Sequence, residues 1–116
     1  MYVAIAVDPG SKERAMELAD LLAQYGLKMV QKGLWESFAV SSDTLIRIKK
    51  DVDKATDAFD RLRFFQFPME ETLVLSTLKD KKWRRMVARQ AEPDQTQTVP
   101  KARPATRQKP VTRKTR

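Results

Sequence analysis

The sequence of 116 residues contains no cysteine and no histidine. The lack of cysteine excludes disulfide frameworks, thiolate zinc sites and cysteine nucleophiles. The lack of histidine excludes Ser-His-Asp triads and histidine metal clusters. No apolar run approaches the roughly 20 residues that a membrane-spanning helix needs, and the start lacks the features of a signal peptide. We therefore expect a cytoplasmic protein with no membrane segment, in which any catalysis depends on carboxylates, hydroxyls, lysine or a carboxylate-bound metal.

Charge is unbalanced and unevenly distributed. The chain has 23 Lys and Arg against 15 Asp and Glu, a net charge of +8. This favours a polyanionic partner, nucleic acid first and an acidic membrane surface second. Residues 1–78 carry 10 basic and 12 acidic side chains, whereas residues 79–116 carry 13 and 3. We therefore predict a folded domain over 1–78, a basic segment over 79–92 and a basic tail over 93–116.

The two C-terminal segments differ in composition. In residues 79–92, Trp83, Met86 and Val87 stand among basic side chains, which is compatible with a basic helix. Residues 93–116 contain four of the six prolines and no aromatic residue. We expect this tail to be disordered because it has too little apolar area to bury. It is either a mobile cationic arm that binds phosphates or a solubilising extension.

Two amphipathic helices are predicted within residues 1–78. Ser11 and Ser41-Ser42-Asp43 are N-cap signals, and Gly26 is a typical helix stop. Apolar residues at helical spacing follow each cap. They are Ala15, Leu18, Ala19, Leu22 and Tyr25 in the first helix, and Leu45, Ile48, Val52, Ala55 and Phe59 in the second.

The remaining segments have strand character. Residues 2–7 are apolar on both sides, as in a central strand, and end at the turn Asp8-Pro9-Gly10. We expect a hairpin over 27–40 with its turn at Gly33. Strands are also expected over 61–67, ended by Pro68, and over 72–78.

The order β-α-β-β-α-β followed by a further strand predicts an α+β fold of the ferredoxin-like type. Two helices would cover one face of a four-stranded antiparallel sheet. The strand over 61–67 carries aromatic residues on both faces, so we expect a homodimer packed through the sheet faces. The strand over 72–78 has no evident place in the four-stranded sheet, and an edge of the partner copy is one place for it.

Asp8 is the carboxylate at the carboxyl end of the central strand. A lone aspartate before a tight turn is commonly a turn or capping residue. At a strand end, beside a helix start, it is also a candidate catalytic residue. Its spacing alone does not decide between these interpretations.

Taken together, four segments resemble the CRISPR-associated protein two family, and they cover residues 1 to about 78. They are MYVAIAVDPGSKER, LLAQYGLKMVQKGLWE, SSDTLIRIKKDVD and RLRFFQFP. The sequence departs from the family pattern at Gly33 and Trp35, where serine and phenylalanine are usual. A toxin-associated nuclease family of the same fold, virulence-associated protein D, has a similar opening.

The resemblance implies a homodimer that bridges dimers of the CRISPR integrase subunit, CRISPR-associated protein one. Such a dimer supports double-stranded prespacer DNA during spacer acquisition. It also implies an alternative activity as a Mg²⁺-dependent endonuclease, because some relatives hydrolyse RNA or DNA. In the family, Asp8 of each subunit faces its twin, and two such carboxylates would hold one Mg²⁺.

Eight basic residues are candidates for nucleic-acid binding. Lys12 and Arg14 begin the first helix, where the helix dipole also favours phosphate; the alternative is a solvated helix face without a partner. The second cluster consists of Lys79, Lys81, Lys82, Arg84, Arg85 and Arg89. No pattern for reading base edges is evident, so we expect recognition by charge and shape.

Three other functions stay open at this point. One is a stand-alone Mg²⁺-dependent endoribonuclease of the toxin type, and another is an RNA-binding or ribosome-associated protein. The third, a small-molecule sensor, has less support because no Gly-rich ligand loop is present. The ferredoxin-like plan by itself does not choose among them.

Overall fold

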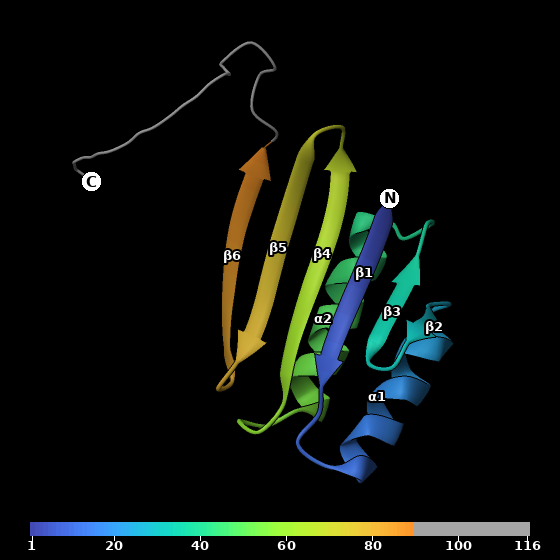
Figure 1. Ribbon diagram of the computed structural model, residues 1–116, viewed down its shortest axis with the longest axis vertical. Helices are drawn as coiled ribbons and strands as arrows, with labels where there is room; N and C mark the ends of the chain where they lie inside the picture. Colours follow the sequence, from blue (N-terminus) through green and yellow to red (C-terminus); the bar gives the residue numbers. More distant parts are fainter. Residues whose placement is uncertain (90–116) are drawn as a thin grey trace, which may run out of the picture.

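The computed structural model describes residues 1–89, so the predicted tail at 93–116 and the end of the basic segment lie outside it. These described residues form six strands and two helices (Figure 1). The elements are β1 (Tyr2–Asp8), α1 (Lys12–Gln24), β2 (Lys28–Gln31), β3 (Leu34–Ser37), α2 (Ser42–Ala55), β4 (Arg61–Met69), β5 (Thr72–Lys79) and β6 (Lys82–Arg89).

All strands join one antiparallel sheet in the order β2-β3-β1-β4-β5-β6. Both helices lie on the same face of this sheet (Figure 1). The α+β prediction is confirmed, and the first four strands with their helices have the arrangement expected of a ferredoxin-like fold. No helix in residues 1–89 is long and apolar enough to cross a membrane.

Both predicted helix caps are present. The Ser11 hydroxyl accepts a hydrogen bond from the Arg14 amide at 3.1 Å, and Ser41 accepts one from Thr44 at the same distance. Each bond satisfies an amide that has no partner within its helix. One member of the predicted apolar stripe is wrong: α2 ends at Ala55, and the side chain of Phe59 lies in the following loop, 81% exposed.

The hairpin between β2 and β3 turns at Gly33, as predicted, and contacts the end of β1. The Val7 amide donates to the Gly33 carbonyl at 2.6 Å. Gly33 has a φ of +77°, and a Cβ there would lie 2.8 Å from the Val7 carbonyl oxygen. Only glycine fits this close approach, which fixes the turn and its neighbour Lys32 beside the carboxyl end of β1.

The structure corrects the expectations for the C-terminal strands. Residues 72–79 pair with β4 of the same chain, with Phe65 opposite Leu75, rather than being left to a partner. Residues 82–89 form strand β6 and not a helix. Asp80 and Lys81 both have positive φ, which is the geometry of a tight hairpin turn. This turn returns the chain along the free edge of β5. The backbone hydrogen bonds between β5 and β6 then outweigh the helix propensity of the basic segment.

Strand β4 continues through Pro68 to Met69, so proline does not end it. The pairing with β5 shifts between Gln66 and Met69. This irregularity accommodates Pro68, which has no backbone N–H to donate to the hydrogen bonds between β4 and β5.

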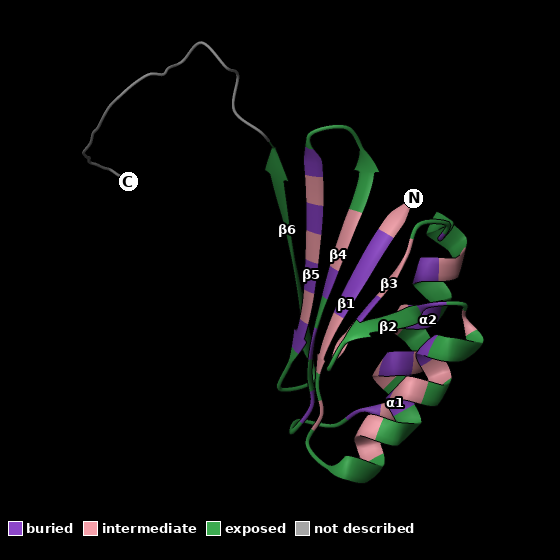
Figure 2. Cartoon of the chain, turned by 45° about the vertical axis from the view of Figure 1, so that its right-hand side comes forward, coloured by how far each residue is buried: buried purple, intermediate pink, exposed green. Residues whose placement is uncertain are grey.

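The hydrophobic core lies between the helices and the covered face of the sheet (Figure 2). Strand β1 contributes Val3 and Ile5, and β4 contributes Leu62 and Phe64, all of which are buried. The two helices supply Leu18, Leu22, Ile48 and Val52. The core therefore fixes the sheet firmly from one side. No helix or strand of residues 1–89 covers the other side, which we call the open face.

Asp60 joins the turn after β1 to the start of β4. Its carboxylate is 1% exposed and accepts hydrogen bonds from the amides of Gly10 at 2.7 Å and Asp57 at 2.9 Å. The Arg14 guanidinium lies 3.1 Å from the same carboxylate. These three contacts hold the ends of β1, α1 and β4 together, and so they position the residues described next.

Candidate nucleic-acid interface

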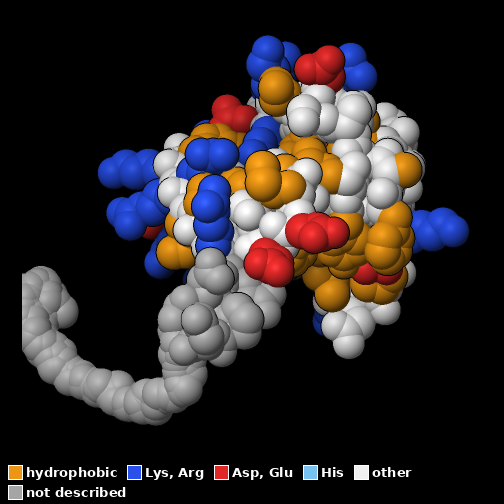
Figure 3. All heavy atoms as spheres, turned by 90° about the horizontal axis from the view of Figure 1, so that it is seen from above, with side chains coloured by type: hydrophobic (Ala, Val, Ile, Leu, Met, Phe, Trp, Pro, Cys, Tyr) orange, Lys and Arg blue, Asp and Glu red, His pale blue; other side chains and the backbone are white. Residues whose placement is uncertain are grey.

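The open face is divided into an apolar half and a basic half. Strand register places Ala4, Phe65, Leu75 and Met86 in one transverse row, and Ala6, Arg63, Thr77 and Arg84 in the next. Tyr2, Phe38 and Phe67 lie beyond the first row. The centroid of the Tyr2 ring is 4.8 Å from that of Phe38 and 5.9 Å from that of Phe67. We call the surface formed by this first row and these three aromatic residues the apolar half. It consists of Tyr2, Ala4, Phe38, Phe65, Phe67, Leu75 and Met86. Hydrophobic side chains gather at this end of the molecule in Figure 3.

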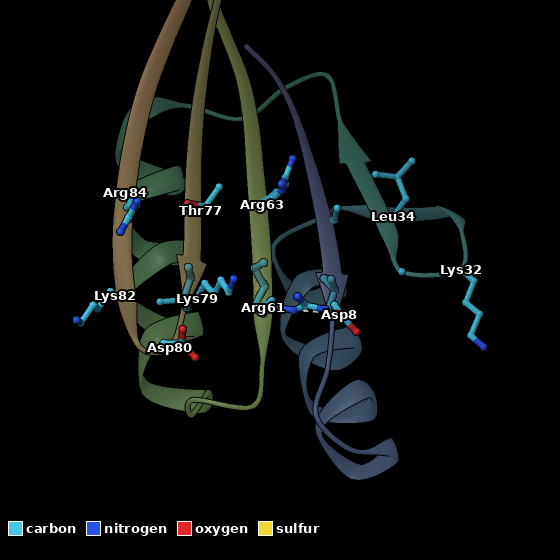
Figure 4. A pocket seen from close by; sticks show the side chains of 15 residues that line it. Asp8, Lys32, Leu34, Arg61, Arg63, Thr77, Lys79, Asp80, Lys82 and Arg84 are labelled. Carbon is cyan, nitrogen blue, oxygen red and sulfur yellow. Dashed lines mark hydrogen bonds and ion pairs between the residues drawn. The ribbon is translucent and has the colours of Figure 1, made fainter.

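The basic half surrounds a shallow hollow of about 920 Å³. Six cationic side chains and two carboxylates line it, and they come from β1, the β2–β3 turn, β4, β5, the β5–β6 turn and β6 (Figure 4). The cations are Lys32, Arg61, Arg63, Lys79, Lys82 and Arg84, and the carboxylates are Asp8 and Asp80. This set is called the basic hollow below, and its excess of positive charge suits a polyanion.

Asp8 lies at the carboxyl end of β1, as the sequence predicted, and it lines the basic hollow. Arg61 of β4 donates to the same Asp8 oxygen through Nε, at 3.1 Å, and through a terminal nitrogen. Figure 4 shows the two side chains next to each other at the ends of their strands. Both are more than half exposed, so the pair contributes little stability and is open to exchange with other charged groups.

The residues of one chain do not fit a magnesium ion by themselves. Within residues 1–89, no group of three or more acidic side chains lies close enough together to hold a metal ion. Mg²⁺ prefers six oxygen ligands in an octahedron, and the nearest charged partner of Asp8 is a cation, Arg61.

The predicted basic residues divide between the two faces. Lys79, Lys82 and Arg84 lie in the basic hollow. Because side chains alternate along a strand, Arg85 and Arg89 point to the helix side, opposite Ser76 and Thr72. Lys81 also turns to that side, where its ammonium lies 3.5 Å from Asp53 of α2. Because residues 82–89 form a strand and not a helix, the predicted basic cluster is divided between the two faces of the sheet.

The two candidates at the start of α1 do not join the hollow. Lys12 is exposed in the first turn and lies outside the lining residues. Arg14 contacts three carboxylates, those of Glu17 at 3.2 Å, Asp57 at 3.4 Å and Asp60 at 3.1 Å. These contacts give Arg14 a structural role, and we remove it from the candidate nucleic-acid contacts.

Sequence reasoning missed three cations of the hollow, namely Lys32, Arg61 and Arg63. The signal for Arg63 was present, because alternation along 61–67 places it opposite the buried pair Leu62 and Phe64. Lys32 and Arg61 reach the basic hollow only because Gly33 and Asp60 hold their backbone segments against the end of β1. Those long-range contacts have no signature in the local sequence.

Comparison with known families agrees with this architecture. A family model described as CRISPR associated protein Cas2 matches residues 1–86. The chain belongs to the Cas2 family. The match spans β1 to β5 and most of β6, so it includes every residue of the basic hollow. It confirms the family resemblance noted in the sequence and places the chain among CRISPR-associated proteins. No curated protein and no solved structure was found to match the chain.

Proposed function

We propose that this Cas2 protein is the structural subunit of CRISPR adaptation that binds duplex prespacer DNA through its basic hollow. The observation that carries the proposal is the concentration of six cations on one open sheet face. Arg63 and Arg84 flank Thr77 in a single row, and Lys79 and Lys82 form the adjoining pair. A flat row of cations binds phosphates along a rod-like polyanion and does not enter a groove to read bases.

The apolar half supports the second part of the proposal, a homodimer. Phe38, Phe67 and Met86 are exposed there, beside the half-buried Phe65 and Leu75. A contiguous apolar surface of this kind on a small protein is typical of an interaction site. A second copy, which carries the same apolar rows, is a self-complementary cover for it. We further propose that the dimer bridges integrase dimers, a role implied by the family and tested by co-purification with CRISPR-associated protein one.

The direct test removes two cations from the hollow. Because hydrogen bonds to charged groups are worth about 1.5–3 kcal/mol each, we expect Arg63→Gln/Arg84→Gln to weaken duplex binding by about a hundredfold or more. Binding is measured by fluorescence anisotropy of a labelled duplex. The matched control is Arg47→Gln/Lys28→Gln, which removes two exposed cations that lie outside the basic hollow. Equal weakening by both double variants would contradict a localised site.

A second candidate function is Mg²⁺-dependent nucleic-acid hydrolysis, favoured by the exposure of Asp8 within the hollow. It requires a magnesium ion shared by the Asp8 carboxylates of two copies, which stays a prediction. The variant Asp8→Asn separates the two functions. For a scaffold, we expect duplex binding to tighten by about two- to fivefold, because a negative charge is removed and Arg61 is released. Weaker binding, together with loss of a Mg²⁺-dependent cleavage activity, would favour the nuclease.

A further inference from the structure

A second group of positive charge lies on the helix side of the outer strands, away from the basic hollow. Lys49 of α2 reaches across to β5, where its ammonium donates to the Ser76 hydroxyl at 3.0 Å. Ser76 is 3% exposed, and Arg85 of β6 is its direct cross-strand neighbour. Lys49 and Arg85 therefore flank the same buried hydroxyl group, on the side of the sheet opposite to Arg63 and Arg84.

These two cations have no anionic partner within residues 1–89. No ion pair of Lys49 or Arg85 is found there. Asp53, one turn of α2 further on, accepts a hydrogen bond from the Trp83 indole at 3.0 Å and faces Lys81. Burial first, and then the charge of Arg85, lower the pKa of the Lys49 ammonium. Two adjacent cations, one of them half-buried, are unfavourable unless an anion compensates them.

The space beside Lys49 is open to a ligand. A hollow of about 300 Å³ lies there, lined by Lys49, Lys50, Asp53, Lys54 and Trp83. The Lys49 ammonium lies 5.8 Å from the centre of the Phe64 ring, and the Phe64 and Trp83 rings are 5.5 Å apart. The aromatic rings and Ser76 thus hold the lysine stem in place, while two of its three N–H groups stay available.

We propose that Lys49 and Arg85 form a binding site for a phosphate group, with Ser76 orienting the lysine. A guanidinium and an ammonium on either side of the same hydroxyl group supply the charge and the donors that the oxygens of a phosphate mono- or diester accept. The phosphate belongs either to a nucleic-acid strand that passes the outer edge of the sheet or to a free nucleotide. The site is independent of the basic hollow because the sheet separates the two.

The test uses the full chain and adenosine 5′-monophosphate as the free probe. Trp83 reports binding, because its indole N–H signal in NMR spectra comes from the site and the chain has only 2 tryptophans. We expect the nucleotide to shift this signal and to raise the pKa of Lys49 measured by NMR. The variants Arg85→Gln and Lys49→Met should each weaken binding about tenfold or more. The control Arg47→Gln, which changes an exposed cation of α2, should leave the affinity unchanged.

A labelled duplex distinguishes the two sources of phosphate. If the site contacts nucleic acid, Arg85→Gln will reduce the slope of log affinity against log salt by about 0.9. If it binds free nucleotides, the slope stays the same while the nucleotide still shifts Trp83. Both results support the site. No shift of Trp83 with either ligand, or equal weakening by Arg47→Gln, would overturn it without affecting the test of Arg63 and Arg84.

Discussion

Replacing Asp60 with alanine is expected to lower the free energy of unfolding by about 3 kcal/mol or more, at the lower end of the range for breaking a buried ion pair. The carboxylate is almost completely buried, so its loss leaves the Gly10 and Asp57 amides without their acceptor. Each unsatisfied buried donor costs about 1–3 kcal/mol. Arg14 limits the loss, because it keeps Glu17 and Asp57 as partners.

Thermal and urea denaturation, followed by circular dichroism, measure this effect. A loss of 3 kcal/mol corresponds to a decrease in Tm of about 12–24 °C for a domain of this size. The matched control is Asp57→Ala, an exposed carboxylate of the same loop that also contacts Arg14. We expect it to cost less than about 1 kcal/mol. If the two variants are equally stable, Asp60 does not hold the ends of β1, α1 and β4 together.

The substitution Met86→Glu is expected to dissociate the proposed homodimer. Met86 is 58% exposed at the outer end of the apolar row that contains Phe65 and Leu75, so the folded monomer tolerates a carboxylate there. In the dimer, each carboxylate would be buried against apolar side chains at a cost of about 2 kcal/mol or more. Because each dimer contains two substituted copies, we expect the dissociation constant to increase about a thousandfold.

Val87→Glu is the control for this experiment. Val87 is the next residue of β6, is 52% exposed and points to the helix side. It introduces the same charge on the same strand but outside the apolar half. Sedimentation equilibrium over a range of concentrations should show a dimer for the unchanged chain and for Val87→Glu, and a monomer for Met86→Glu. A monomeric unchanged chain would refute the proposed interface.

Local patterns predicted most of the first four strands and both helices. Ser11, Ser41 and Gly26 mark helix ends through contacts within a few residues, and such contacts are visible in a sequence. The alternation of Leu62, Arg63 and Phe64 likewise indicated which side chains face the helices. Strand β6 was missed because Asp80-Lys81 lacks the glycine that usually marks a two-residue hairpin turn.

The candidate site was only partly predictable for a related reason. Asp8 was found because a turn signal follows a buried strand, and Lys79, Lys82 and Arg84 were found by composition. Their grouping depends on which face of β6 each side chain occupies, and a helix had been expected there. Pairing between distant strands decides that question, and it depends on tertiary contacts that one sequence does not display.

The salt dependence of duplex affinity tests the central claim most directly. If the basic hollow neutralises about five phosphates, the slope of log affinity against log salt should be about −4.5, with no dependence on base sequence. Arg63→Gln/Arg84→Gln should reduce the magnitude of this slope by about 1.8. A slope near zero, a strong preference for one base sequence, or an unchanged slope in the double variant would contradict the account.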